Sequence, residues 1–115
     1  MRVIVCGGRD YANRERVNAV LDKLHREAGI SRIIEGGAKG ADRLASDWAE
    51  SLAVPTTRYE ADWEAHGTFA GPRRNATMLE DGQPDLVIAF PGGVGTRNMI
   101  RQARKAGVEV VEIAP

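Results

Sequence analysis

The sequence predicts an α/β fold, a three-layer Rossmann-like doubly wound parallel sheet of five strands, within a single domain over residues 1–115. Short β-branched and apolar runs alternate along the chain with segments whose apolar residues recur at helical spacing. The strands are separated by connections long enough to hold helices, which favours parallel pairing through right-handed crossovers. A chain of 115 residues is large enough for one hydrophobic core and too small for two.

Five segments are expected to form strands: Arg2–Cys6, Arg32–Glu35, Pro55–Tyr59, Asp85–Phe90 and Glu109–Ile113. The first and the fourth are strongly apolar, which is typical of central strands that are buried on both faces. The third begins with a proline, which is compatible with the start of a strand or with an edge position. We expect the strand order 3-2-1-4-5, in which strands one and four flank the topological switch point.

Four helices are expected, at Asn13–Ala28, at Ala41–Ala53, at Pro72–Glu80 and in a segment that ends at Gly107. Pro72 suits the first turn of the third helix, because the first turn of a helix does not need that amide hydrogen. Residues Glu60–Gly71 are the least periodic part of the chain, and we expect them to form an extended loop.

The composition argues against several classes of partner. The 16 basic and 16 acidic residues balance, so no strong field attracts nucleic acid or anionic lipid, and nucleic acid is disfavoured as a partner. No apolar run reaches the roughly 18 residues that a membrane span requires. A single cysteine, Cys6, forms no internal disulfide, and the amino-terminal segment is a strand rather than a signal peptide. We therefore expect a soluble cytoplasmic protein.

Metals and the common cofactors are also disfavoured. No set of histidines and cysteines has the spacing of metal ligands, so no metal site is expected. The chain lacks the dinucleotide pattern GxGxxG and the phosphate-loop pattern GxxxxGK[ST], which argues against NAD and against ATP hydrolysis. No cofactor is expected.

Three strand ends lead directly into paired glycines and then into a helix-compatible segment: VIVCGGRD, IIEGGAKGAD and LVIAFPGGVGT. In such turns, bare backbone amides and a helix N-terminus face an anion. In the predicted strand order all three turns border one crevice. The sequence therefore predicts a phosphate-bearing ligand, and the candidate backbone contacts are Gly7, Gly8, Gly36, Gly37, Gly40, Pro91, Gly92, Gly93 and Gly95.

Side chains within the turns add candidate ligand contacts. Arg9 and Lys39 are candidate counter-charges for a phosphate, and Asp10 accompanies Arg9 either as a ligand contact or as its ion-pair partner. Asp42 is expected either to cap the second helix or to bind a ribose hydroxyl. Thr96 is expected to cap the fourth helix or to donate its hydroxyl to a phosphate oxygen.

The irregular segment after the third strand supplies the remaining candidates. A polar loop of this length often carries function, and it starts at the same edge of the sheet as the glycine turns. Trp63 is expected either to stack on a base or to cover an edge of the core. Arg73 and Asn75 lie in the first turns of a helix, where they suit anion and ribose contacts. Arg73 and Asp62 are the candidate catalytic residues.

Four blocks of this sequence, GGRDY, GGAKGADRLASDWA, DWEAHGTFAGPRRNATM and PDLVIAFPGGVGTRNM, resemble the small YspA-like proteins of the SLOG superfamily. That superfamily of Rossmann-like domains also includes the Lonely Guy phosphoribohydrolases and the Smf/DprA proteins. The resemblance covers essentially the whole chain and implies binding of a nucleotide or nucleotide derivative at the glycine turns. Related domains occur in bacterial and phage conflict systems, where they are thought to sense or process such ligands.

The resemblance also bears on catalysis. Lonely Guy enzymes carry PGGxGTxxE, whose glutamate supports cleavage of a base from a ribose monophosphate. Pro91–Thr96 match that pattern here, but Met99 stands at the position of the glutamate. Those enzymes also use an arginine on a preceding helix, for which Arg73 or Arg74 is the counterpart. Asp62, Glu60, Asp10 or Asp42 are alternative sources of the missing carboxylate.

Three functions therefore stay open. The first is a domain that binds a nucleotide or nucleotide-derived ligand, as a sensor or processing domain without strong catalysis. The second is an N-glycosidase that cleaves a nucleoside monophosphate into base and ribose phosphate. The third is an adaptor that binds single-stranded nucleic acid or protein. The apolar faces of the second and fourth helices also allow a homodimer or a higher homo-oligomer, which is the expected assembly.

Overall fold

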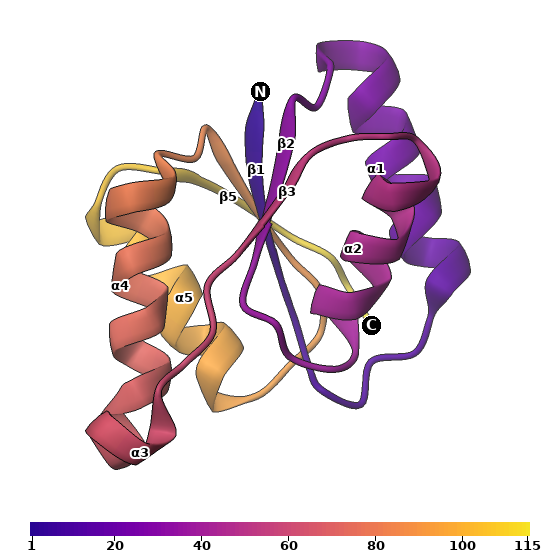
Figure 1. The fold of residues 1–115 in the computed structure, drawn as a ribbon. Helices are drawn as coiled ribbons and strands as arrows, with labels where there is room; N and C mark the ends of the chain where they lie inside the picture. Colours follow the sequence, from indigo (N-terminus) through magenta and orange to yellow (C-terminus); the bar gives the residue numbers. More distant parts are fainter.

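The computed structural model describes residues 1–115 and contains one sheet of five parallel strands with helices on both faces (Figure 1). The strands are β1 (Arg2–Cys6), β2 (Arg32–Glu35), β3 (Thr56–Arg58), β4 (Leu86–Ala89) and β5 (Glu109–Glu112). Their order in the sheet is β3-β2-β1-β4-β5. The predicted fold class and strand order are confirmed.

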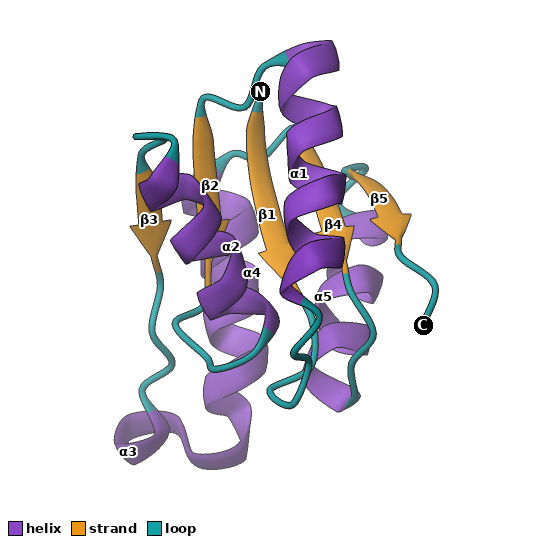
Figure 2. Ribbon diagram, turned by 90° about the vertical axis from the view of Figure 1, so that its right-hand side faces the viewer, coloured by secondary structure: helices purple, strands orange, loops and turns teal.

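The central strand β1 pairs with β2 on one side and with β4 on the other. Val3 lies opposite Ile33 of β2 and opposite Leu86 of β4, and all three side chains are buried. At the edge of the sheet, Glu35 of β2 lies opposite Arg58 of β3. Because all strands run in the same direction, their carboxyl ends and the turns that follow them lie at one edge of the sheet (Figure 2).

The helices form the two outer layers. Helices α1 (Arg14–Ala28) and α2 (Ala41–Ser51) cover one face, and α4 (Ala70–Gly82) and α5 (Val94–Lys105) cover the other (Figure 1). The larger core cluster lies under α1 and α2 and includes Leu21, Leu44 and Trp48. The smaller cluster lies under α4 and α5. It includes Met78 and Met99, so Met99 is a core residue that is 1% exposed.

The segment expected as an extended loop is partly helical, and this expectation is wrong. Residues Trp63–His66 form the short helix α3, and Gly67–Phe69 form a 3-10 turn, η1. The Asp62 carboxylate caps α3 by accepting a hydrogen bond from the Ala65 amide at 3.0 Å. Gly67 ends α3 with a positive φ of 55°. One helical turn has too few residues to show a periodic pattern.

Helix α4 begins two residues before the predicted start. Pro72 is therefore its third residue rather than its first. This position is still within the first turn, where an amide has no acceptor in the helix, so the missing N–H of proline costs nothing. No helix of the structure is both long enough and apolar enough to cross a membrane.

Candidate functional site

The three glycine turns meet at the carboxyl edge of the sheet and contact one another. The Gly8 amide donates a hydrogen bond to the Pro91 carbonyl at 2.8 Å, which joins the first turn to the third. The Gly8 carbonyl accepts one from the Ala41 amide at 3.3 Å, which joins the first turn to the start of α2. Segments separated by more than 80 residues in the sequence therefore form one continuous surface.

Glycine is required where the turns cross. At Gly40, where φ is 76°, a Cβ atom would lie 2.1 Å from the Gly8 carbonyl oxygen. At Gly92, a Cβ atom would lie 2.2 Å from the Thr96 hydroxyl oxygen and 2.7 Å from the Gly8 nitrogen. No side chain fits at either position without moving the backbone.

A cavity of about 1180 Å³ opens between the three turns and the α3–α4 segment. Most of the ligand contacts expected from the sequence line it, namely Gly7, Gly8, Arg9, Asp10, Gly36, Gly37, Asp42, Trp63, Asn75, Pro91, Gly92, Gly93, Gly95 and Thr96. Lys39, Gly40, Arg73 and Asp62 do not line it. Arg73 and Asp62 are exposed, and Asp62 is occupied as the cap of α3.

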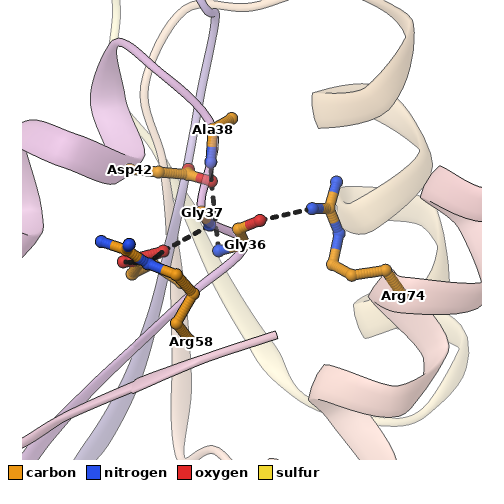
Figure 3. A network of polar contacts seen from close by, with 7 residues as sticks. Gly36, Gly37, Ala38, Asp42, Arg58 and Arg74 are labelled. Atoms are coloured by element: carbon orange, nitrogen blue, oxygen red, sulfur yellow. Dashed lines mark hydrogen bonds and ion pairs between the residues drawn. The ribbon is translucent and has the colours of Figure 1, made fainter. Parts of the chain in front are cut away.

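Three amides of the second glycine turn, those of Gly36, Gly37 and Ala38, are not available to a ligand, because carboxylates of the chain already accept from them (Figure 3). Asp42 Oδ2 accepts hydrogen bonds from the Gly36 amide at 3.1 Å and from the Ala38 amide at 3.2 Å. The Gly37 amide donates to Glu35 Oε1. The turn thus binds two anions that the protein itself supplies.

Glu35 is fully buried and is held in place from the neighbouring strand. Arg58 Nε donates to Glu35 Oε2 at 3.0 Å, and about half of the Arg58 side chain is exposed. An unpaired charge at this depth would be strongly destabilising, so the ion pair with Arg58 and the Gly37 amide make the buried carboxylate tolerable. Glu35 is therefore a structural residue of the turn.

Asp42 is the buried carboxyl group of the cavity. Its pKa is raised from 3.8 to about 6, mainly because burial removes water from the charged form and also because the Glu35 carboxylate is near. The hydrogen bonds from Ala38 and Gly36 and the positive charge of Arg74 oppose this shift in pKa. Both hydrogen bonds go to Oδ2, so Oδ1 has no donor from the chain.

Arg74, rather than Arg73, links α4 to the turns. Its Nη1 donates to the Gly36 carbonyl at 2.7 Å (Figure 3). Its Nε donates to Asn75 Oδ1 at 3.0 Å. Asn75 in turn donates from Nδ2 to Asn98 Oδ1 at 3.1 Å and to the Gly95 carbonyl at 3.3 Å. This chain of contacts fixes α4 against both the second and the third turn.

The third turn has open amides. Helix α5 begins after Gly93, and no side chain caps it. None of the amides from Gly93 to Thr96 donates a hydrogen bond within the chain, and all four residues line the cavity. Thr96 is buried inside the first turn of α5, so it does not cap the helix. Asn98 and Arg101, on the same helix, also line the cavity.

The aromatic side of the cavity comes from α3. The Trp63 side chain is 58% exposed and leans over the start of α4, where its Cη2 would lie 3.5 Å from a Cβ atom at Gly71. It does not belong to either core cluster. This exposure leaves the Trp63 ring accessible to a ligand, and stacking on a base stays a prediction.

Cys6 also lines the cavity, where its thiol stays protonated at neutral pH. Burial raises the pKa of the Cys6 thiol to about 12, with a further contribution from the Asp42 carboxylate. Two of the lining residues, Asn98 and Arg101, are missed by the sequence analysis, which names Arg74 only as an alternative to Arg73.

The comparisons with known proteins agree with this geometry. The family described as "YspA, cpYpsA-related SLOG family" matches residues 1–66. The Gene 61 protein of Mycobacterium phage D29 is 42% identical over 118 residues, which cover 96% of this chain and 94% of the phage protein.

Among solved structures, DNA processing protein A (DprA) from Streptococcus pneumoniae superposes with a TM-score of 0.81 at 20% identity. The match covers 99% of this chain and 50% of the DprA chain, so this chain spans half the length of that protein. At this identity the likeness establishes the fold alone.

Proposed function

The chain belongs to the YspA, cpYpsA-related SLOG family, and from that premise we propose that it binds a nucleotide or nucleotide-derived ligand in the cavity between the three turns. The observation that carries the proposal is the start of α5, where the amides from Gly93 to Thr96 have no partner in the chain and face this cavity. A phosphate group is the ligand chemistry that such amides bind.

Both electrostatic attraction and hydrogen bonding favour the binding of a phosphate at the start of α5. The N-terminus of a helix stabilises an anion by about 0.3–1 kcal/mol, and each hydrogen bond to a charged group adds about 1.5–3 kcal/mol. Arg101 lies on the same helix and lines the cavity without an ion-pair partner. The second turn is a poorer alternative because Asp42 and Glu35 already accept from its Gly36, Gly37 and Ala38 amides.

The remaining lining residues suit the other parts of a nucleotide. The Trp63 ring offers an exposed aromatic face for a base. The free Oδ1 of Asp42 accepts a hydrogen bond from a ribose hydroxyl.

A substitution at the helix cap tests the phosphate position. In Gly93→Asp the new carboxylate accepts from the first-turn amides and so occupies the phosphate site. A Cβ atom at Gly93 meets nothing within 4 Å, so the side chain fits. We expect the unliganded variant to be more stable than the wild type by about 0.5 kcal/mol, because aspartate is a good cap, while nucleotide affinity falls at least about 10-fold.

Affinities are measured through Trp63 fluorescence and thermal shift with nucleoside mono- and diphosphates. Ser31→Asp adds the same charge at an exposed site far from the cavity and serves as the control. If no nucleotide stabilises the wild-type protein at millimolar concentration, the proposal is wrong. If Gly93→Asp binds as tightly as Ser31→Asp, the phosphate does not lie at α5.

One observation favours a second candidate, an N-glycosidase that acts on the bound nucleotide. The Asp42 carboxyl lies in the cavity, and its pKa of about 6 is close to neutral pH, which suits a general base. In the reaction, Asp42 takes a proton from a water molecule whose oxygen bonds to C1′ of the ribose. The C1′–N bond breaks, and the base leaves with its electron pair and is protonated by solvent.

Release of free base, followed by chromatography, tests the glycosidase. Asp42→Asn is expected to abolish turnover while the variant still binds nucleotide. Arg73→Ala and Asp62→Ala, which change residues outside the cavity, are expected to leave turnover near the wild-type value. If the wild-type protein releases no base from any nucleoside monophosphate, binding without catalysis stands as the function.

Single-stranded nucleic acid, the ligand of the adaptor that the sequence leaves open, is the remaining alternative. Competition separates the two cases. If a mononucleotide displaces a labelled oligonucleotide, both occupy the same cavity. Strongly salt-dependent oligonucleotide binding that no mononucleotide displaces would support the adaptor function instead.

A further inference from the structure

A second, smaller cavity of about 350 Å³ adjoins the nucleotide cavity on the other side of the first glycine turn. Arg9, Asp10 and Tyr11 line both cavities, so the two lie next to each other at this turn. The smaller cavity is completed by Arg14, at the start of α1, and by Gly40 and Arg43, at the start of α2. We call it the arginine pocket.

The arginine pocket has an excess of positive charge. Three guanidinium groups line it and Asp10 is the only carboxylate that does so. Arg9 and Arg43 form no ion pair. Arg14 forms one with Asp47, at 3.0 Å from Nη2 to Oδ2, but Asp47 does not line the pocket. Positive charges around one pocket repel one another, and a bound anion reduces this repulsion.

The walls of the pocket are fixed. The Tyr11 ring packs against Phe90, which is buried in the core, with 5.3 Å between ring centroids. Arg14 is oriented by Asp47. Gly40 adds no side chain to the wall of the pocket, because none fits beside the Gly8 carbonyl. The pocket is much larger than the roughly 30 Å³ that one water molecule fills in the liquid, so it has room for a phosphate group.

We propose that the arginine pocket binds a second phosphate group of the same ligand, and that the ligand is therefore a nucleoside bisphosphate or a dinucleotide. This inference rests on the proposed function, since the first phosphate lies at α5. Guanidinium groups bind phosphate through paired hydrogen bonds. The two cavities share the wall formed by Arg9, Asp10 and Tyr11, so a ligand in one cavity extends to the other around these residues.

The two phosphate sites are separable by amide NMR during a titration with inorganic phosphate. We expect one set of shifted signals from Gly93–Thr96 and a second set from Gly40 and Arg43. Arg43→Ala removes the second set and leaves the first. This variant is expected to fold, because the Arg43 side chain is exposed and makes no hydrogen bond or ion pair. Arg26→Ala, which removes an exposed arginine at the far end of α1, is the matched control.

If the signals of Gly40 and Arg43 do not shift in the wild-type protein, the second site does not exist and the inference is overturned. The same follows if Arg43→Ala and Arg26→Ala behave alike. Absence of shifts at Gly93–Thr96 would instead count against the proposed function. The two failures are therefore distinguishable in one experiment.

Nucleotide affinities then test the class of ligand. We expect adenosine 3′,5′-bisphosphate or the 5′-phosphorylated dinucleotide pApA to bind the wild-type protein and Arg26→Ala at least about 5-fold more tightly than AMP does. In Arg43→Ala this gain disappears while the affinity for AMP is unchanged. If neither two-phosphate ligand binds more tightly than AMP, or if Arg43→Ala weakens AMP equally, the ligand does not span the two cavities.

Discussion

Asp42 occupies two amides of the second glycine turn that a ligand could otherwise bind. From the sequence, Asp42 was expected either to cap α2 or to bind a ribose hydroxyl, because both functions suit an aspartate after a glycine turn. In the structure it is the second residue of α2, and its side chain turns back to the Gly36 and Ala38 amides. The sequence shows which residue types are present, but the direction of a side chain depends on dihedral angles that it does not show.

Asp42 makes stability depend on pH in a direction opposite to that of a surface carboxylate. Its pKa is about 6 in the folded protein and about 4 when unfolded, so between these values the folded state binds more protons. This contribution to the free energy of unfolding is therefore fully present below about pH 4 and is lost as the pH rises through 6, up to about 3 kcal/mol in total. Asp42→Asn keeps the acceptor oxygen and removes the charge.

Thermal denaturation of the wild type and Asp42→Asn between pH 4 and pH 8 measures this effect. The difference isolates Asp42 because all other carboxylates are common to both proteins. We expect the variant to gain stability relative to the wild type as the pH rises. If the difference in stability between the two proteins stays constant across this range, folding does not raise the pKa of Asp42.

Two glycines of the third turn are expected to respond oppositely to alanine. In Gly92→Ala the new Cβ would overlap the Thr96 hydroxyl, so we expect a loss of about 1–3 kcal/mol of stability. In Gly95→Ala the Cβ meets nothing within 4 Å, and the residue is helical, so we expect a gain of about 0.4–1 kcal/mol. Urea denaturation checks both values. Equal effects would mean that the turn adapts to a side chain at position 92.

At the scale of elements, the rotational phase of α4 determines which arginine reaches the cavity. Each residue of a helix is rotated by about 100° from the one before it, so neighbouring side chains point in different directions. A helix start that is predicted two residues too late does not show which of these side chains faces the cavity. Arg73 and Arg74 have the same side-chain chemistry, and only the packing of Met78 into the core places Arg74 inward. Helix α3 was missed because one turn carries no periodic pattern.

Arg74 and Arg73 form a matched pair for testing that phase. Arg74→Gln loses the hydrogen bond from Nη1 to the Gly36 carbonyl and a positive charge near Asp42. Because Arg74 is partly exposed, we expect a loss of about 1–2 kcal/mol. Arg73→Gln changes an exposed side chain and is expected to stay within about 0.5 kcal/mol of the wild type. Chemical denaturation measures both, and a larger effect at Arg73 would contradict this orientation of α4.

At the scale of the whole molecule, the strand order followed from the sequence because chain connectivity leaves few alternatives. Helix-length connections require parallel pairing, and the two most apolar strands belong in the centre. Convergence of the three turns follows from that order. The strand order does not show which amides of the turns lack a partner, because this depends on nearby side chains, such as Asp42 and Glu35, that accept hydrogen bonds from the turn.

The expected homo-oligomer stays a prediction, but the helix faces proposed for it are already occupied. The apolar residues of α2, such as Leu44 and Trp48, and those of α5, such as Met99 and Ala103, are buried within the chain itself. An assembly would therefore have to use other surfaces. Sedimentation velocity at micromolar concentration measures the oligomeric state directly.

Unfolding is expected to be one cooperative transition, as the prediction of a single domain over residues 1–115 requires. The radius of gyration is 12.8 Å, close to the roughly 13 Å of one domain of this length. The two tryptophans report on different regions. Trp48 is in the core, where it packs edge-on against His25, and Trp63 lies on α3 at the rim of the cavity.

In Trp63→Phe the fluorescence comes from Trp48 alone, and in Trp48→Phe it comes from Trp63. We expect both signals and the circular dichroism to change at the same urea concentration, because α3 is fixed to α4 and α4 is fixed to the sheet and the turns through Arg74, Asn75 and Met78. If the Trp63 signal changes first, the rim of the cavity opens before the core, and the base would then bind to a segment that the sheet does not hold rigid.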